Sequence, residues 1–187
     1  MLPSEIVTRL EASATQARTV IKPLRVVLDT NAVLDWRVFG DPDARAVGAA
    51  IEQRRLQWLT TLRMLAELSA VLQRPLPAHW EPARKLALTI DLAASAVVCS
   101  EPARAVTLAC RDTDDQVFID LAHAMSPVVL LTRDRALLAL RRRASHHGIE
   151  ISTAASWRPQ LDGLVPADFN EWGPGHGDMK KAARRPP

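Results

Sequence analysis

The stretch that decides the fold is RVVLDTN, residues 25–31, in which a short apolar run leads directly into an acid, Asp29. A nearly continuous apolar run is typical of a strand that is buried on both faces of a sheet. The same form returns in VVLLTRD, residues 128–134, which ends in Asp134. The sequence therefore contains two carboxylates that each follow a predicted buried strand, and their role has to be explained.

Strand-like and helix-like segments alternate along the chain, which predicts an α/β fold with a central, mainly parallel sheet flanked by helices in three layers. The expected strands are 24–28, 56–61, 96–100, 128–131 and 149–152. The expected helices are 4–19, 30–37, 43–55, 62–73, 81–95, 113–125 and 135–143, and in the 113–125 helix Thr113 and Gln116 suit a capping box.

Length and composition predict one folded domain with extensions. The chain has 187 residues, of which 48% are hydrophobic and 24% charged, a globular composition. We expect an N-terminal extension over 1–23, a domain over 24–158 and a C-terminal extension over 159–187. The last fifteen residues, rich in Gly, Pro, Lys and Arg, are expected to be disordered.

The net charge of +3 lies entirely in those last fifteen residues, so residues 1–172 are neutral by formal count. The body of the protein is therefore not broadly basic, and any nucleic acid must be held by local patches. No apolar run is long enough for a membrane helix, and the N-terminus lacks a secretory pattern. A cytoplasmic location without membrane association is expected.

Asp29 and Asp134 each follow a predicted strand directly, and in parallel sheets functional sites gather beyond the carboxyl ends of the strands. For either acid alone, capping the following helix is the favoured interpretation. Two acids at equivalent positions favour a shared site.

Two further acids are candidates for that site. Glu67 lies in an otherwise apolar helix, LRMLAELSAVL, where the alternative is an exposed side chain paired with Arg63. Asp115 begins the run DQVFIDLA and precedes apolar residues that are expected to pack. Asp112 and Asp114 lie close by and are alternative acids for the same place, whereas Asp120 is interpreted as a surface acid.

Carboxylates that converge repel one another, by roughly 4 kcal/mol at about 4 Å and an effective dielectric of about 20. Such a cluster either takes up protons or binds a cation. An all-oxygen ligand set favours Mg²⁺ or Mn²⁺ over zinc. The histidines form no metal-binding pattern and the two cysteines, Cys99 and Cys110, have no C-x-x-C spacing, so we expect them to be small core residues.

The ordered set of Asp-Thr-Asn after the first strand, a helical Glu, CRDTDDQVFIDLA and a strand that ends in Thr-x-Asp resembles the PIN domain, most closely the VapC-like toxins of bacterial type II toxin–antitoxin systems. The resemblance covers about residues 24–158. It implies a PIN-like fold and a ribonuclease that depends on Mg²⁺ or Mn²⁺. Carried over by position, it implies Asp29, Glu67, Asp115 and Asp134 as catalytic and metal-binding residues, with Thr30, Asn31 and Thr132 as polar supports.

The resemblance also implies a small antitoxin protein as partner, besides the RNA substrate, and leaves a homodimer open. Arg133 stands where such proteins often carry Gly, and we expect phosphate contacts from Arg133, Arg135 and Arg141. The alternative for the run 141–143 is a solvated helix end. Two other functions stay open: a PIN-like module that binds RNA or protein without catalysis, and a phosphatase of haloacid-dehalogenase type with Asp29 as nucleophile. The phosphatase pattern has a second Asp two positions after the nucleophile, where this chain has Asn31.

Overall fold

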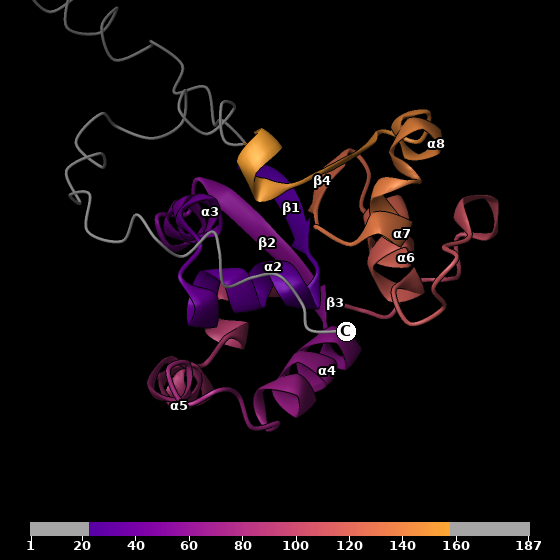
Figure 1. The fold of residues 1–187 in the computed structure, drawn as a ribbon. Coiled ribbons are helices and arrows are strands. Elements are labelled where there is room, and N and C mark those ends of the chain that lie inside the picture. Colours follow the sequence, from indigo (N-terminus) through magenta and orange to yellow (C-terminus); the bar gives the residue numbers. More distant parts are fainter. Residues whose placement is uncertain (1–22, 158–187) are drawn as a thin grey trace, which may run out of the picture.

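The computed structural model describes residues 23–157. Its centre is a sheet of five parallel strands in the order β3-β2-β1-β4-β5, with helices on both sides (Figure 1). The predicted fold class is therefore confirmed. The helix expected at 4–19 and the basic tail lie outside the described residues.

The elements follow one another along the chain as alternating strands and helices. The strands are β1 (Leu24–Leu28), β2 (Leu56–Thr61), β3 (Ala96–Cys99), β4 (Val128–Leu131) and β5 (Ile149–Ser152). The helices are α2 (Thr30–Leu34), α3 (Pro42–Glu52), α4 (Leu62–Leu72), α5 (Glu81–Thr89), α6 (Gln116–Ala124), α7 (Arg135–Leu138) and α8 (Arg141–Ser145). A π-helical segment, η1 (Asp35–Phe39), continues α2, and two short 3-10 turns cover Ala93–Ser95 and Val106–Leu108.

Alternate residues of the strands pack against two separate hydrophobic clusters, one on each face of the sheet. In β1, Val26 and Leu28 pack with α2, η1, α3, α4 and α5, while Val27 packs with α6, α7 and α8. Both faces of β1 and β4 are thus covered, which is why their sequences are apolar without interruption. No helix within residues 23–157 has both the length and the apolar composition needed to cross a membrane.

The strand order places β1 in the middle of the sheet, between β2 and β4. The register pairs Leu28 with Leu131, and the Asp29 N–H donates to the Leu131 carbonyl. Because all strands run the same way, their carboxyl ends meet at one edge, which we call the rim. Asp29 and Thr132 are the residues that follow β1 and β4 there.

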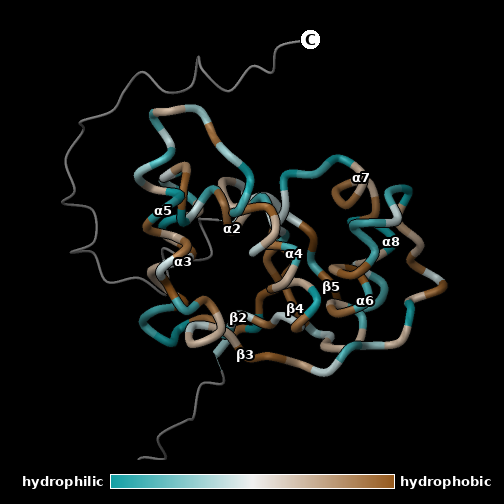
Figure 2. Tube along the Cα trace, turned by 90° about the horizontal axis from the view of Figure 1, so that it is seen from below, coloured by the Kyte–Doolittle hydropathy of each residue, from teal (hydrophilic) through white to brown (hydrophobic). Residues whose placement is uncertain are grey.

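The outer strand β3 lies at the margin of the fold and is drawn largely in the hydrophobic colour (Figure 2). Val97 and Val98 point to opposite faces of the sheet, yet 43% and 42% of their surfaces are exposed. This edge is therefore much less covered than the centre of the sheet.

Three local predictions from the sequence are wrong. The helix expected at 113–125 begins only at Gln116, because the Gln116 side chain does not cap the helix but accepts from the Cys110 N–H and donates to the Leu108 carbonyl. The helix expected at 135–143 is split into α7 and α8 by a tight turn in which the Leu140 N–H bonds to the Leu137 carbonyl. The helix expected at 81–95 ends at Thr89.

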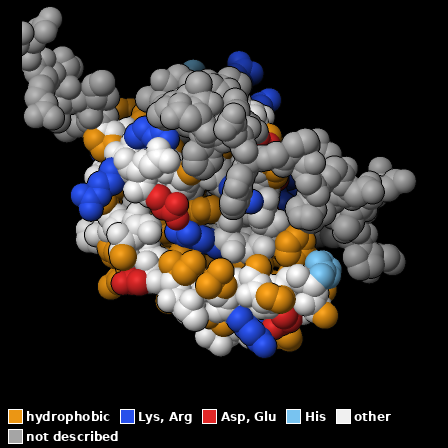
Figure 3. All heavy atoms as spheres, turned by 90° about the vertical axis from the view of Figure 1, so that its left-hand side faces the viewer, with side chains coloured by type: hydrophobic (Ala, Val, Ile, Leu, Met, Phe, Trp, Pro, Cys, Tyr) orange, Lys and Arg blue, Asp and Glu red, His pale blue; other side chains and the backbone are white. Residues whose placement is uncertain are grey.

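The outer surface carries charges of both signs. On the face in Figure 3, Lys and Arg side chains lie dispersed among acidic and apolar ones and do not form a continuous basic patch. This arrangement agrees with the neutral formal charge of residues 1–172.

Gly48 in α3 provides a test of the packing beside the rim. A Cβ added at Gly48 would overlap the indole of Trp36, the residue next to Asp35. Gly to Ala in a helix ordinarily stabilises by up to about 1 kcal/mol, but overpacking a core costs about 1–3 kcal/mol. We therefore expect Gly48→Ala to lower the free energy of unfolding measured in urea, and by more than the neighbouring control Ala49→Gly. A gain in stability would contradict this packing.

Candidate active site

Asp29 is an almost fully buried carboxylate, 2% exposed, at the centre of the rim. Its Oδ2 accepts a hydrogen bond from the Thr132 hydroxyl at 2.5 Å, and its Oδ1 accepts from the Ala32 N–H, also at 2.5 Å. Asp29 therefore caps α2, as the simpler interpretation of the sequence expected. The bond to Thr132 shows that it also takes part in a contact between β1 and β4.

Asp134 holds the equivalent place after β4. Its Oδ1 accepts from the backbone N–H groups of Ala136 and Leu137 at 2.6 and 3.3 Å, which caps α7. Its own N–H donates to the Thr132 hydroxyl at 2.9 Å. The Thr132 hydroxyl thus receives one hydrogen bond from Asp134 and gives one to Asp29, so it fixes the two segments relative to each other.

Glu67 reaches the rim from α4. The Thr30 hydroxyl donates to Glu67 Oε1 at 3.5 Å, a long hydrogen bond between the first turn of α2 and the second turn of α4. The alternative partner, Arg63, makes no ion pair with Glu67 in the described part of the chain. The backbone N–H of Arg63 donates to the carboxylate of Glu101. Glu67 is exposed, so its carboxylate is accessible at the mouth of the site.

Asp115 precedes α6 and makes no side-chain capping bond. Its pKa is raised to about 6, first by burial and then by the negative charges of Asp134, Asp112, Asp29 and Glu67. The structure therefore brings four acids from four separate segments within electrostatic range of one another. The carboxylate of Asp115 is not used to stabilise its own helix, which leaves it for another role.

The two alternative acids differ in their relation to this group. Asp112 is exposed and accepts from the Asp114 N–H at 3.0 Å, and its charge also raises the pKa of Asp115. Asp114 is exposed and is not among the groups that shift Asp115. Asp120, interpreted as a surface acid, instead accepts from the Ala105 N–H and from the Gln116 amide, so it supports the loop before α6.

Asp35 is a rim residue that the sequence reasoning missed. It is 8% exposed at the start of η1, and burial raises its pKa to about 6, although the positive charge of Arg133 acts in the opposite direction. Arg133 Nη2 lies 2.9 Å from Asp35 Oδ1. The signal was available: Asp35 is an acid within the apolar run AVLDWRVF, just as Glu67 is in its helix.

The other predicted supports and phosphate contacts lie further out. Asn31 is exposed in the first turn of α2, and its side chain makes no hydrogen bond within residues 23–157. Arg135 is exposed at the start of α7. Arg141 lies beside the outer strand β5, where it lines an open groove with Arg142 and Glu150. Nothing in the structure joins Arg141 to the acids.

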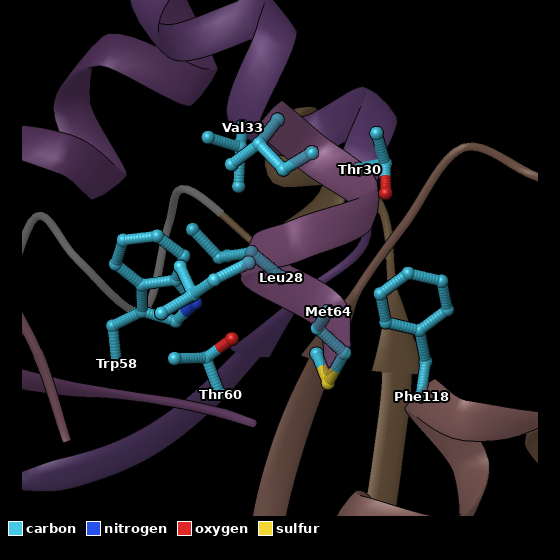
Figure 4. A pocket seen from close by; sticks show the side chains of 9 residues that line it. Leu28, Thr30, Val33, Trp58, Thr60, Met64 and Phe118 are labelled. Carbon is cyan, nitrogen blue, oxygen red and sulfur yellow. The ribbon is translucent and has the colours of Figure 1, made fainter. Parts of the chain in front are cut away.

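A small cavity lies beneath the rim, lined by side chains of β1, β2, α2, α4 and α6, with Thr30 at one side and Met64 and Phe118 close by (Figure 4). Its volume of about 10 Å³ is that of one water molecule at most. The cavity is therefore a packing defect and is too small to be a substrate pocket.

The donor set has the chemistry of a divalent-cation site. Every candidate ligand is an oxygen, and after burial the nearby negative charges of Asp134, Asp112, Asp29 and Glu67 are what raise the pKa of Asp115. A hard cation such as Mg²⁺ suits such a set. As the side chains lie, no three acidic, His or Cys residues among the described ones are close enough to hold one ion together. The charges fit a metal, but the structure shows no ready-made cage.

The raised pKa values predict how stability depends on pH. In the folded protein Asp29, Asp35 and Asp115 titrate near pH 6, above the unfolded value of 3.8, so the native state binds more protons between these values and stability falls as the pH rises through them. We expect the metal-free protein to be more stable at pH 5 than at pH 8 by on the order of 2 kcal/mol, as measured by urea unfolding.

One variant checks the cause of this pH effect, and the strongly shifted Glu81 does not contribute to it. Asp29→Asn should shrink the difference between pH 5 and pH 8, because it removes one of the titrating groups. The pKa of Glu81 is lowered to about 2 by its hydrogen bonds to Arg84 and the Leu76 N–H, so Glu81 titrates below this window. Stability that rises from pH 5 to pH 8 in the absence of metal would contradict the electrostatic picture.

Comparison with known proteins agrees with the fold. The family model of the PIN domain matches residues 25–136, which include Asp29, Glu67, Asp115 and Asp134. No curated protein matches the chain. PIN domains are typically nucleases, hydrolases of phosphodiester bonds, that use divalent metal ions. Since the match spans more than half of the sequence, the chain belongs to the PIN-domain family.

Proposed function

We propose that this protein is an endoribonuclease that depends on Mg²⁺ or Mn²⁺ and cleaves RNA at the rim of its sheet. The observation that carries the proposal is the gathering of acids from separate segments at one edge of the sheet, where Thr132 joins Asp29 to Asp134 and Thr30 contacts Glu67. The pKa of Asp115 agrees with this, since burial raises it first and the charges of Asp134, Asp112, Asp29 and Glu67 raise it further. Four carboxylates from distant segments repel one another and so oppose folding. Binding of a cation and a phosphate is a function for which such an arrangement is suited.

The roles of the individual residues follow from their contacts. Asp29 is fixed by Thr132 and by the N–H of Ala32, so it supplies a rigid carboxylate. Asp134 has Oδ1 bound to the start of α7, and Glu67 is held loosely by Thr30. A bound divalent cation would lower the pKa of water and neutralise phosphate charge. Asp115, with a pKa of about 6, is suited to accept a proton from the attacking water.

The phosphatase alternative receives less support from this geometry. A nucleophilic oxygen must move toward the phosphorus, whereas both oxygens of Asp29 are fixed by hydrogen bonds inside the protein, which suits a stationary ligand better than a nucleophile. The position two residues on is Asn31, an exposed amide that cannot act as an acid. The second alternative, a binding module without catalysis, retains the same fold and is separated only by an activity measurement.

The test of the nuclease function is cleavage of a labelled single-stranded RNA by the purified full chain. We expect cleavage with Mg²⁺ or Mn²⁺ and none with EDTA. Asp29→Asn should lower the rate by about 100-fold or more, because a neutral amide holds a cation poorly. The control Glu150→Gln removes an exposed acid from β5 and should cleave like the wild type.

Paired variants decide which acid of the DTDD segment, residues 112–115, is used. Asp115→Asn should lose cleavage and Asp114→Asn should keep it, since only Asp115 is coupled to the other acids. A protein that binds RNA but does not cleave it under any metal condition would support the binding module instead. Full metal-dependent cleavage by Asp29→Asn would contradict the proposed site.

We further propose that the protein is the toxin of a toxin–antitoxin pair. The support for this finer role is the resemblance of the ordered motifs, together with a rim that attracts cationic groups. An Arg side chain of a small antitoxin can form paired hydrogen bonds with carboxylates and so compete with a metal ion. Such a partner would restrain the nuclease in the cell that makes it.

The toxin role predicts a response to metal. The partner would be the small protein encoded directly upstream, purified in complex with this chain. We expect the complex to be inactive, and excess Mg²⁺ or Mn²⁺ to restore part of the RNA cleavage because the metal displaces the partner's Arg from the carboxylates. Inhibition that is indifferent to metal would mean that the partner acts elsewhere on the surface.

A further inference from the structure

The ion pair between Arg133 and Asp35 joins two segments of the rim that are remote in sequence. Arg133 lies in the loop after β4, between Thr132 and Asp134, and Asp35 is the first residue of η1. Their charged atoms, Arg133 Nη2 and Asp35 Oδ1, are 2.9 Å apart. The acid is nearly buried, with 11% of its side chain exposed, whereas 53% of the Arg133 side chain is exposed.

This asymmetry does not suit a purely stabilising role. Burying the carboxylate of Asp35 is unfavourable, as its raised pKa shows. An ion pair with a half-exposed partner contributes little to the free energy of folding. A guanidinium has five N–H donors in one plane, more than the carboxylate of Asp35 can occupy. The remaining donors are available to a ligand, in an orientation that Asp35 fixes. π-Helical segments are rare overall, but those that occur lie frequently at functional sites. The π-helical segment η1 begins with Asp35 and presents it to Arg133.

The rim also needs a cation beside the metal if it is to receive RNA. Asp29, Glu67, Asp115 and Asp134 give it a negative charge that repels a phosphate backbone. Among the described residues, the positive charge that acts on both Asp29 and Asp35 is that of Arg133. Arg133 therefore lies next to the acids without forming its ion pair with any of the proposed metal ligands.

We propose that Arg133 binds a phosphate of the RNA substrate next to the cleaved bond, and that Asp35 is a positioning residue that holds the guanidinium toward the substrate. The inference rests on the proposed ribonuclease function and adds a substrate contact to it. Guanidinium and phosphate form paired charge-assisted hydrogen bonds. A guanidinium that is already oriented loses less freedom when it binds.

The test measures kcat and KM for RNA cleavage in Mg²⁺ at several salt concentrations. The variants are Arg133→Gln, Asp35→Asn and the double variant. The control is Arg74→Gln, which removes an exposed charge beyond the end of α4 that lies away from the rim. Thermal unfolding of each variant verifies that it is folded. For Arg133→Gln we expect kcat/KM to fall roughly tenfold, mainly through KM.

Two further results separate the proposal from simple electrostatics. Loss of one phosphate contact should make the slope of log kcat/KM against log salt shallower by about 0.7, and Arg74→Gln should not change it. Removing an acid from a negative rim would by itself favour RNA, so a bystander at position 35 predicts that Asp35→Asn raises kcat/KM. An orienting role predicts that Asp35→Asn lowers kcat/KM in the wild type. In the Arg133→Gln background, the same substitution should not lower kcat/KM further.

Each outcome bears on the proposal. The expected losses, with non-additive behaviour of the double variant, support it. If the wild type is active and Arg133→Gln has the same kcat/KM as the control Arg74→Gln, the phosphate contact is overturned while the ribonuclease function stands. If Asp35→Asn raises kcat/KM, the positioning role is overturned. A wild-type protein that neither binds nor cleaves RNA overturns the proposed function and, with it, this inference.

Discussion

The hydrogen bond from the Thr132 hydroxyl to the Asp29 carboxylate is the contact on which the site depends. It joins residues 103 positions apart in the sequence, and it exists because β1 and β4 are paired in parallel with Leu28 opposite Leu131. A shift of either strand by one residue would turn its apolar side chains to the wrong face. The hydrophobic clusters on the two faces of the sheet therefore fix the positions of the polar residues at its edge.

The backbone also makes a cluster of acids tolerable. Asp29 and Asp134 each accept N–H groups at the start of the helix that follows, α2 and α7. Unpaired N–H groups carry partial positive charge, so each carboxylate is partly compensated where it stands. Asp115 lacks such a bond, and burial together with the charges of the neighbouring acids raises its pKa to about 6. Capping and site formation are thus not competing interpretations of the same acids, because the caps keep the carboxylates in place at the rim.

The parts of the site that the sequence predicts are those set by local patterns. The apolar runs before Asp29 and Asp134 located β1 and β4 to the residue, and the lone acid in the apolar helix α4 pointed to Glu67. Gln116 was misread because its side chain satisfies a loop that reaches α6 only in the folded chain. Asp35 could have been found as an acid within an apolar run, but its pairing with Arg133 could not, since no local pattern connects the two segments.

Arg133 and Asp35 also show how one residue constrains another at a crowded rim. An Arg between Thr132 and Asp134 puts a long cation near Asp29, where its charge opposes the rise in pKa that burial causes. Without another acid nearby, that cation would pair with Asp29 or the other rim carboxylates. Asp35 provides the alternative partner, buried in η1 and on a separate segment from Thr132 and Asp134. The buried acid in η1 is therefore the counterpart of the Arg in the loop, since it keeps positive and negative groups of the site apart while both remain at the same edge of the sheet.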